Sequence, residues 1–133
     1  MKLTTKSEYS ILAMLYLVRQ SKDVFVKVDE IARECDIPKK YLELLLMSLR
    51  QNQLIRTRRG SQGGYQLAKP AGEITLASII RLMDGALAPT ESVSRYFHSN
   101  TPIQKEAKML EVFQDIRDYI ANKLENLTLK DLI

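Results

Sequence analysis

The sequence is poor in the residues that most often carry chemistry: its 133 residues include one Cys, one His and no Trp. A single cysteine cannot form an internal disulfide bond, so a reducing compartment is the simplest setting and we expect a cytoplasmic protein. Cys35 and His98 lie far apart in the chain, and residues 60–64 lack the Lys-Ser/Thr that ends a phosphate-binding loop. The sequence therefore predicts neither an enzyme nor a bound cofactor or metal.

Long apolar runs are also absent. No stretch approaches the roughly 20 apolar residues that a membrane span needs, and residues 1–6 have neither the apolar core nor the cleavage site of a signal peptide. Hydrophobic residues make up 45% of the chain and charged residues 27%, a mixture typical of a folded domain. We therefore expect one domain with an appendage and no membrane association.

Charge is distributed unevenly along the chain. Residues 1–70 hold 13 Lys and Arg against 7 Asp and Glu, a net charge of +6, whereas residues 71–133 hold 7 against 9, a net charge of −2. Arg50, Arg56, Arg58 and Arg59 fall in a stretch without any acidic residue. This cluster favours a polyanionic partner over the alternative of an ordinary solvated surface.

Apolar periodicity predicts three helices in the first half. The first spans about residues 5–20, with Thr5 and Glu8 spaced as a capping box. A short helix follows from Asp29 to about Cys35, and Pro38 starts a second amphipathic helix that runs to about Asn52. A short helix, a tight break and a second helix have the spacing of a helix–turn–helix.

A β-hairpin is predicted immediately after these helices. Alternating residues 54–59 and 65–67 flank the glycine-rich residues 60–64, and residues 24–26 could add a minor strand. A hairpin in this position is a wing. The fold class is therefore mainly α with a small β-hairpin, a winged helix–turn–helix domain carrying a long C-terminal helix.

The second half is predicted to contain one short and one long helix. Thr75 and Gly85 bracket the short helix, and Thr101-Pro102 with Gln104 precedes the long one. The long helix carries an apolar stripe of Ile103, Ala107, Leu110, Phe113, Ile116, Ile120 and Leu124. This stripe is wide enough to pair with the same helix of a second chain, although burial against its own domain is the alternative. We divide the chain into a winged domain (1–85), a sensor-type loop (86–101) and a dimerisation helix with a C-terminal helical turn (102–133).

Residues that could contact DNA fall into three groups. At the start of the second helix of the motif, Lys39, Lys40 and Glu43 are left free by the buried side, and this end of the helix enters the major groove in winged helices. In the wing, Arg58 and Arg59 beside Gly60, Gly63 and Gly64 could enter the narrow minor groove. Pro38 is a candidate as the first residue of the second helix of the motif. Phosphate contacts are expected from the remaining candidates: Lys2, Thr4, Thr5, Lys6, Tyr41 and Arg50.

A series of short motifs runs through the chain: MKLTTK at 1–6, EIA at 30–32, KYLE at 40–43, LR at 49–50, RG at 59–60, GGYQL at 63–67, EIT at 73–75, LAP at 87–89 and TLKDL at 128–132. In this order they resemble the Rrf2 (BadM-type) family of bacterial transcription regulators over nearly the whole chain. The resemblance implies a homodimer of winged-helix domains linked by the long helix. It also implies base contacts near Lys40 and Glu43 and a minor-groove arginine at Arg59.

The sequence departs from this family at the sensor loop. Cluster-binding members hold an iron–sulfur cluster with three cysteines in that loop, whereas this loop has none, and Ser92 stands where the first ligand is expected. An iron–sulfur cluster needs several thiolate ligands, so we do not expect one in this protein. Cys35 lies in the helix–turn–helix and is predicted to be a small buried hydrophobe, with a redox switch as the alternative. Many relatives have Gln where this chain has Leu44, so the preferred DNA sequence can differ.

The function expected from the sequence is that of a sequence-specific, DNA-binding repressor, a homodimer that reads a two-fold-related operator in double-stranded DNA. Its signal could be an effector protein or a small molecule. The alternative is a winged-helix module that binds proteins and not DNA.

Overall fold

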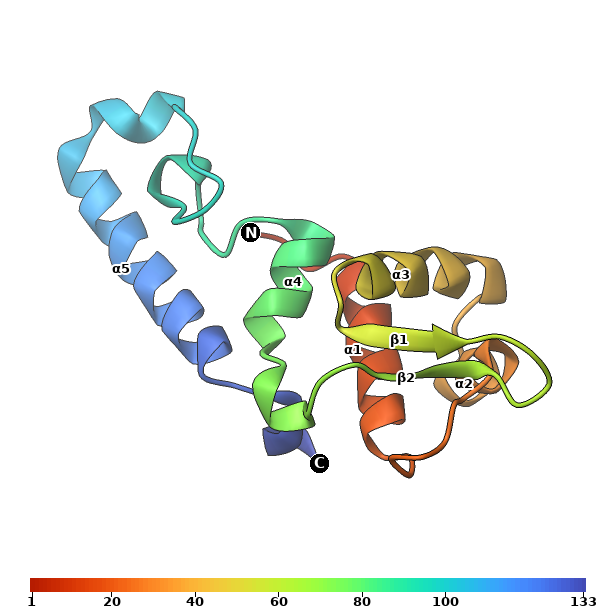
Figure 1. Ribbon diagram of the computed structural model, residues 1–133. Coiled ribbons are helices and arrows are strands. Elements are labelled where there is room, and N and C mark those ends of the chain that lie inside the picture. Colours follow the sequence, from red (N-terminus) through yellow and green to blue (C-terminus); the bar gives the residue numbers. More distant parts are fainter.

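The computed structural model describes all 133 residues, and it is mainly helical with one small β-hairpin, as the sequence predicts (Figure 1). Its helices and strands are α1 (Thr5–Val18), α2 (Val28–Cys35), α3 (Lys39–Gln51), β1 (Ile55–Arg58), β2 (Gly64–Leu67), α4 (Leu76–Asp84) and α5 (Ala107–Glu125). Four short 3-10 turns complete the chain: η1 (Ala71–Glu73), η2 (Glu91–Val93), η3 (Pro102–Lys105) and η4 (Leu129–Leu132). No helix has the length and hydrophobicity that crossing a bilayer requires.

Helix α1 is the centre of the winged domain. Its Met14 is fully buried in the same apolar cluster as Leu42, Leu46 and Leu49 of α3. Burying a side chain of this size stabilises a fold by about 1.5–3 kcal/mol, so this cluster fixes α3 on α1. Tyr16 of α1 donates a hydrogen bond to Glu30 of α2, which raises the pKa of Tyr16 to about 12.

The turn between α2 and α3 depends on two residues. Asp36 caps α2 in the left-handed conformation, at φ 55°, which Asp tolerates better than most residues. Pro38 is the N-cap of α3, which begins at Lys39. Sequence analysis placed Pro38 one position later, as the first residue inside the helix. Between them Ile37 is buried and its amide bonds the carbonyl of Ala32. This geometry aims the N-terminal end of α3 outward.

The hairpin is antiparallel, with Ile55 opposite Leu67 and Arg58 opposite Gly64. The predicted minor strand at residues 24–26 is reduced to one bridge, in which Val26 and Tyr65 exchange two backbone hydrogen bonds of 2.7 Å. Gly64 lies at φ 145°, and a Cβ there would come within 2.5 Å of the Val26 carbonyl oxygen. Glycine is therefore required at this position by the packing of the protein on itself.

The N-terminus of α1 differs from the prediction. Its N-cap is Thr4 and not Thr5: the Thr4 hydroxyl accepts from the Lys6 amide and donates to Asp84 over 2.6 Å. Asp84 also accepts from the Thr4 amide and from the Ser7 hydroxyl. Burial opposes ionisation of Asp84, but these hydrogen bonds outweigh it and hold its pKa below the usual value. The carboxylate at the end of α4 thus replaces the predicted Glu8.

Helix α5 lies on the far side of α4 from the hairpin (Figure 1). It begins at Ala107, because the Thr101-Pro102 signal starts only the turn η3 and Glu106 then takes an extended conformation. After α5 the chain returns to the winged domain, where Leu129 is fully buried and its amide bonds the carbonyl of Ile74. The Thr128–Asp131 capping box holds this last turn.

Candidate nucleic-acid interface

The exposed side of α3 combines charged and apolar residues. Lys40, Glu43, Leu44 and Met47 follow one another at helical steps and are all exposed, Leu44 by 60% and Met47 by 52%. Residues three and four apart share a helix face, so these four side chains form one surface, which we call the α3 face. Sequence analysis noted Leu44 only as a departure from the family and did not name Met47. The signal was present, because the run of four apolar residues at 44–47 exceeds what one buried helix side can accommodate.

The two lysines at the start of α3 differ. Lys39 forms a 2.7 Å ion pair with Asp29 of α2, and the hydrogen bond between them lowers the pKa of Asp29 and raises that of Lys39. Lys40 and Glu43 form no ion pair or side-chain hydrogen bond. Lys39 therefore joins the two helices of the motif, while Lys40 and Glu43 are available to a partner.

The two arginines of the wing also differ. Arg58 donates to the Gln62 carbonyl over 2.7 Å and stacks on Phe25, with its guanidinium carbon 4.3 Å from the ring centroid. Arg59 is exposed without a partner, next to Gly60 at φ 98°. A Cβ on Gly63 would lie 2.1 Å from the Arg58 carbonyl oxygen. Arg58 and Gly63 thus build the turn, and Arg59 is the arginine that the turn presents.

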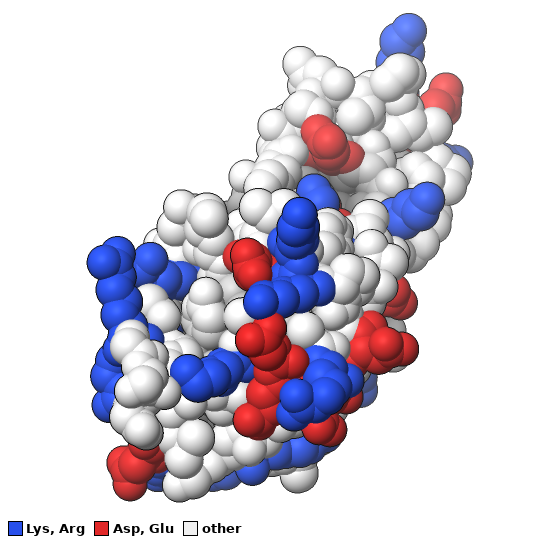
Figure 2. Space-filling model, turned by 90° about the vertical axis from the view of Figure 1, so that its right-hand side faces the viewer, with Lys and Arg blue, Asp and Glu red and all other residues white.

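These features lie toward one end of the winged domain. Strand β1 runs back along α3, so the N-terminal end of α3 and the hairpin turn both lie at the right of Figure 1, opposite α5. The space-filling view of that side shows Lys and Arg along its left edge, with Asp and Glu among them toward the middle (Figure 2). Lys and Arg without neighbouring acidic residues are therefore found mainly along the upper part of that edge in Figure 2, and the others on this face lie among Asp and Glu or apart from that edge.

Pro38 and the predicted phosphate-contacting residues are only partly available. Lys2, Thr5 and Lys6 are exposed at the start of α1, and Pro38 and Arg50 are exposed at the two ends of α3. Thr4 is already engaged by Asp84. Tyr41 is half-buried against Tyr9, with ring centroids 5.7 Å apart and an interplanar angle of 76°. Thr4 and Tyr41 therefore support the surface more than they extend it.

The apolar stripe of the long helix divides along its length. Ile120 and Leu124 pack against Ala77, Ile80 and Leu87 of their own chain. They are half-buried because the C-terminal end of α5 covers α4, and their contact with a second chain stays a prediction. Ile103 lies in η3, ahead of the helix. Further toward the N-terminus, Leu110 and Phe113 of the stripe are half-buried and Ala107 and Ile116 are exposed. The neighbouring apolar residues Met109, Val112 and Tyr119 are exposed as well, Tyr119 by 72%.

The family follows from comparison with known proteins. A family model described as "Rrf2: Iron-dependent Transcriptional regulator" matches residues 3–133. The chain belongs to the Rrf2 family. This is a family of transcription regulators and not of enzymes, so the protein is a DNA-binding transcription regulator.

Individual relatives agree with this assignment. The HTH-type transcriptional regulator IscR of Pectobacterium carotovorum is 33% identical over 135 residues, which cover 100% of this chain and 79% of the relative. The solved structure of CymR, the global cysteine regulator of Bacillus subtilis, is 29% identical and has a TM-score of 0.79 over 99% of this chain and 95% of that one. The oxidised form of Staphylococcus aureus CymR is 36% identical, with a TM-score of 0.73 and the same coverage. The winged-helix fold predicted from the sequence is confirmed.

The iron named in the Rrf2 description has no suitable ligands in this chain. No three His, Cys, Asp or Glu side chains are grouped so that they could hold a metal ion. Ser92, at the position expected for the first cysteine ligand, is buried and accepts a 2.8 Å hydrogen bond from Thr101. Cys35 lies in α2 with its thiol directed at the Leu12 carbonyl, and burial raises its pKa. The residues present do not fit an iron–sulfur cluster, and the raised pKa of Cys35 disfavours a reactive thiolate.

Arginines hold the loop of residues 86–106 against α5. Arg117 of α5 donates to the Val93 carbonyl over 2.8 Å, and Arg95 of the loop bonds both Asp118 and Glu125. Hydrogen bonds from Arg117 and Arg95 lower the pKa of Asp118. Arg81 of α4 joins this network through a 2.6 Å ion pair with Glu125 and stacks on Tyr96 of the loop. The loop is thus fixed by the ion pairs of Arg95 with α5 and by the stacking of Arg81 of α4 on Tyr96.

Proposed function

We propose that the protein is a repressor that binds a two-fold-related operator as a homodimer, with the start of α3 in the major groove and the hairpin turn in the minor groove. The observation that carries this proposal is that Lys40, Glu43 and Arg59 are exposed, unpaired and located toward the same end of the domain. In this scheme residues 1–85 bind DNA, residues 86–101 form the loop and residues 102–133 contain the dimerisation helix.

Each exposed group has a natural acceptor or donor on DNA. Lys40 suits guanine O6 and N7, and Glu43 can accept a hydrogen bond from cytosine N4. Arg59 suits the minor groove, where a narrow width deepens the negative potential. Lys2, Thr5, Lys6 and Arg50 are placed to contact phosphates, which would add affinity without sequence preference.

The α3 face adds an apolar component to this readout. The exposed Leu44 and Met47 follow Lys40 and Glu43 along the same helix side. The only apolar group on a base edge in the major groove is the C5-methyl of thymine. We therefore place thymine opposite Leu44 and Met47, further along the groove than the bases opposite Lys40 and Glu43.

Pairing through α5 would supply the two-fold symmetry. Met109, Val112, Ile116 and Tyr119 leave a row of exposed apolar side chains on one helix, and contiguous apolar surface of this kind marks an interaction site. Leu110 and Phe113, both half-buried, border it. Two chains paired there would present two wings to half-sites about one helical turn of DNA apart. We propose that this dimer acts in the cytoplasm, and that an effector protein or small molecule adjusts its affinity.

Selection from a pool of random DNA duplexes tests the proposal. The protein should enrich a sequence with two-fold symmetry, and its affinity for that duplex should fall as salt rises, with a log–log slope near −0.9 for each phosphate neutralised. Enrichment of single half-sites would contradict the dimer. No enrichment, with equal weak binding to every duplex, would contradict sequence-specific repression.

A further inference from the structure

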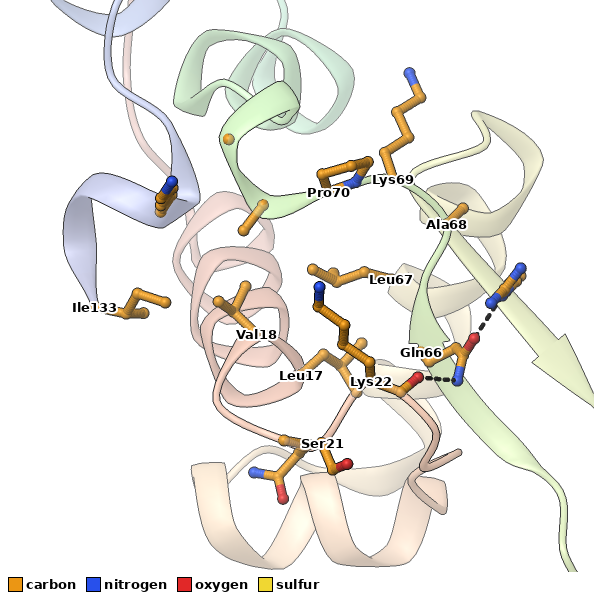
Figure 3. A pocket seen from close by; sticks show the side chains of 15 residues that line it. Leu17, Val18, Ser21, Lys22, Gln66, Leu67, Ala68, Lys69, Pro70 and Ile133 are labelled. Carbon is orange, nitrogen blue, oxygen red and sulfur yellow. Dashed lines mark hydrogen bonds between the residues drawn. The ribbon is translucent and has the colours of Figure 1, made fainter.

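A hollow of about 620 Å³ opens on the winged domain between the end of α1 and the chain that runs from β2 to η1 (Figure 3). Turn η4 closes one edge of it through Lys130 and Ile133. Small-molecule sites in proteins have volumes of roughly 300–1,000 Å³, so the hollow has the size of a ligand site. It lies beside the hairpin strands, away from the hairpin turn and from the α3 face.

The lining of the hollow is one-sided in charge. Four of its 15 residues are cationic, Lys22, Arg56, Lys69 and Lys130, and none is acidic. None of the four forms an ion pair, in contrast to Arg81, Arg95 and Arg117 elsewhere in the chain. Cations gathered in a concave surface reinforce one another's field. The hollow is therefore a place where an anion is favoured.

The remaining surface of the hollow is largely apolar. Leu17 and Val18 of α1 face Leu67 of β2, and Lys22 extends between them toward the middle, whereas Lys69 extends from the rim (Figure 3). An anion without an apolar part would leave these side chains uncovered, and a cation would be repelled. We propose that the hollow binds a small organic anion, with its carboxylate between Lys22 and Lys130 and its apolar body against Leu17, Val18 and Leu67.

Such a ligand would touch the base of the wing. Gln66, which lines the hollow, accepts from the Arg56 side chain over 2.6 Å and donates to the carbonyls of Lys22 and Val24. This one buried amide connects both strands of the hairpin to the segment after α1. An anion that draws Lys22 toward Lys130 would shift the segment whose Lys22 carbonyl accepts from Gln66, and through Gln66 it would move the hairpin and with it Arg59. The coupling to DNA rests on the proposed function, but the binding of the anion does not.

Nuclear magnetic resonance of the full chain tests the site, with octanoate as the probe and octylamine and inorganic phosphate as controls. Octanoate should shift the amide signals of residues 17–22 and 66–72 to saturation, and octylamine should not. Lys22→Glu with Lys130→Glu should weaken octanoate binding at least tenfold, and the neutral Lys22→Gln with Lys130→Gln several-fold. Lys105→Glu with Lys123→Glu, two exposed residues outside the hollow, should change nothing.

Other patterns of shift would overturn the assignment. Equal shifts with octylamine would show that the hollow binds apolar chains without selecting for negative charge. Saturation by phosphate at the same residues would show that the ligand needs no apolar part. Octanoate shifts confined to α5 would place the ligand at the dimer face. Octanoate should also change the affinity for the selected duplex at least threefold in the wild type and not in the Lys22→Glu/Lys130→Glu variant. Saturable binding with unchanged DNA affinity would overturn the coupling to the wing.

Discussion

Arginine does different work in the two halves of this molecule. In the wing, Arg59 is exposed and unpaired, in a half of the chain with a net charge of +6. Around the loop, Arg95 and Arg117 are neutralised by Asp118 and Glu125, in a half with a net charge of −2. The comparison teaches that net charge alone does not identify a binding surface. Cations left without carboxylate partners do, because only they can exchange counterions for DNA phosphates.

The largest expected effect comes from disrupting the proposed dimer. Ile116→Glu places a charge in the exposed apolar row of α5 and should convert the dimer to a monomer. Operator affinity should then fall about 10²–10⁴-fold, because the second half-site no longer binds as part of one molecule. Analytical ultracentrifugation and fluorescence anisotropy measure the two quantities.

Asn122→Glu is the matched control for that variant. It adds the same charge to an exposed polar position of the same helix and should leave the dimer intact. If Ile116→Glu remains dimeric, the subunits meet elsewhere. The second half of the chain would then not have the dimerisation role that we propose for it.

Alanine variants of one arginine from each half test the comparison between unpaired and ion-paired arginines directly. Arg59→Ala should weaken operator binding by about 1–3 kcal/mol, roughly tenfold to a hundredfold, and leave the urea midpoint unchanged. Arg117→Ala should do the reverse: it removes the hydrogen bond to Val93 and should cost roughly 1–2 kcal/mol of stability with little change in DNA affinity. Both effects appearing in one variant would mean that the division of roles is wrong.

A smaller effect is expected from the α3 face. Replacing thymine by deoxyuridine removes only a methyl group, and burial of one such group contributes about 0.8 kcal/mol, or roughly a fourfold change in affinity. The loss should occur at one or two positions of the selected half-site and should disappear in Leu44→Ala or Met47→Ala. If deoxyuridine is tolerated throughout, these side chains do not read thymine.

The smallest effect concerns Asp84, whose carboxylate links α4 to the start of α1. Its pKa is lowered in the folded state, so the stability it contributes is present above the unfolded value near 3.8 and is lost as the pH falls below it. The wild type should therefore exceed Asp84→Asn in urea stability at neutral pH, and the difference should shrink as the pH is lowered toward 3. A constant difference across this range would assign the role of Asp84 to packing instead of charge.

Local signals were predicted well from the sequence. Thr75 caps α4 through the Ser78 amide and Gly85 ends it, because both motifs are contained within a few residues. The hairpin and the helix–turn–helix follow from periodicity in the same way. These patterns gave the fold class, and the family motifs, which span the whole chain, agree with it.

Long-range partners were not predictable by the same means. Thr4 replaces Thr5 as the N-cap because its acceptor, Asp84, lies 80 positions away. Gly63 and Gly64 were selected as part of the DNA-contacting wing, and only the fold shows that a Cβ at these positions would clash with Arg58 and Val26. Only the fold likewise shows that Ile120 and Leu124 pack on α4 of their own chain. The contacts with DNA, the dimer and the signal stay predictions.

Helix α5 is held near its middle and again just beyond its C-terminal end. Arg117 and Asp118 tie it to the loop before it, and Leu129, just beyond it, fills a gap in the core beside Ile74. A helix attached at two points cannot move freely relative to the winged domain. Any dimer built on α5 would therefore hold its two DNA-binding domains at a fixed separation and orientation. Leu129→Ala would weaken one of these two attachments. The dimer should then bind half-sites over a wider range of spacings, without loss of any DNA contact.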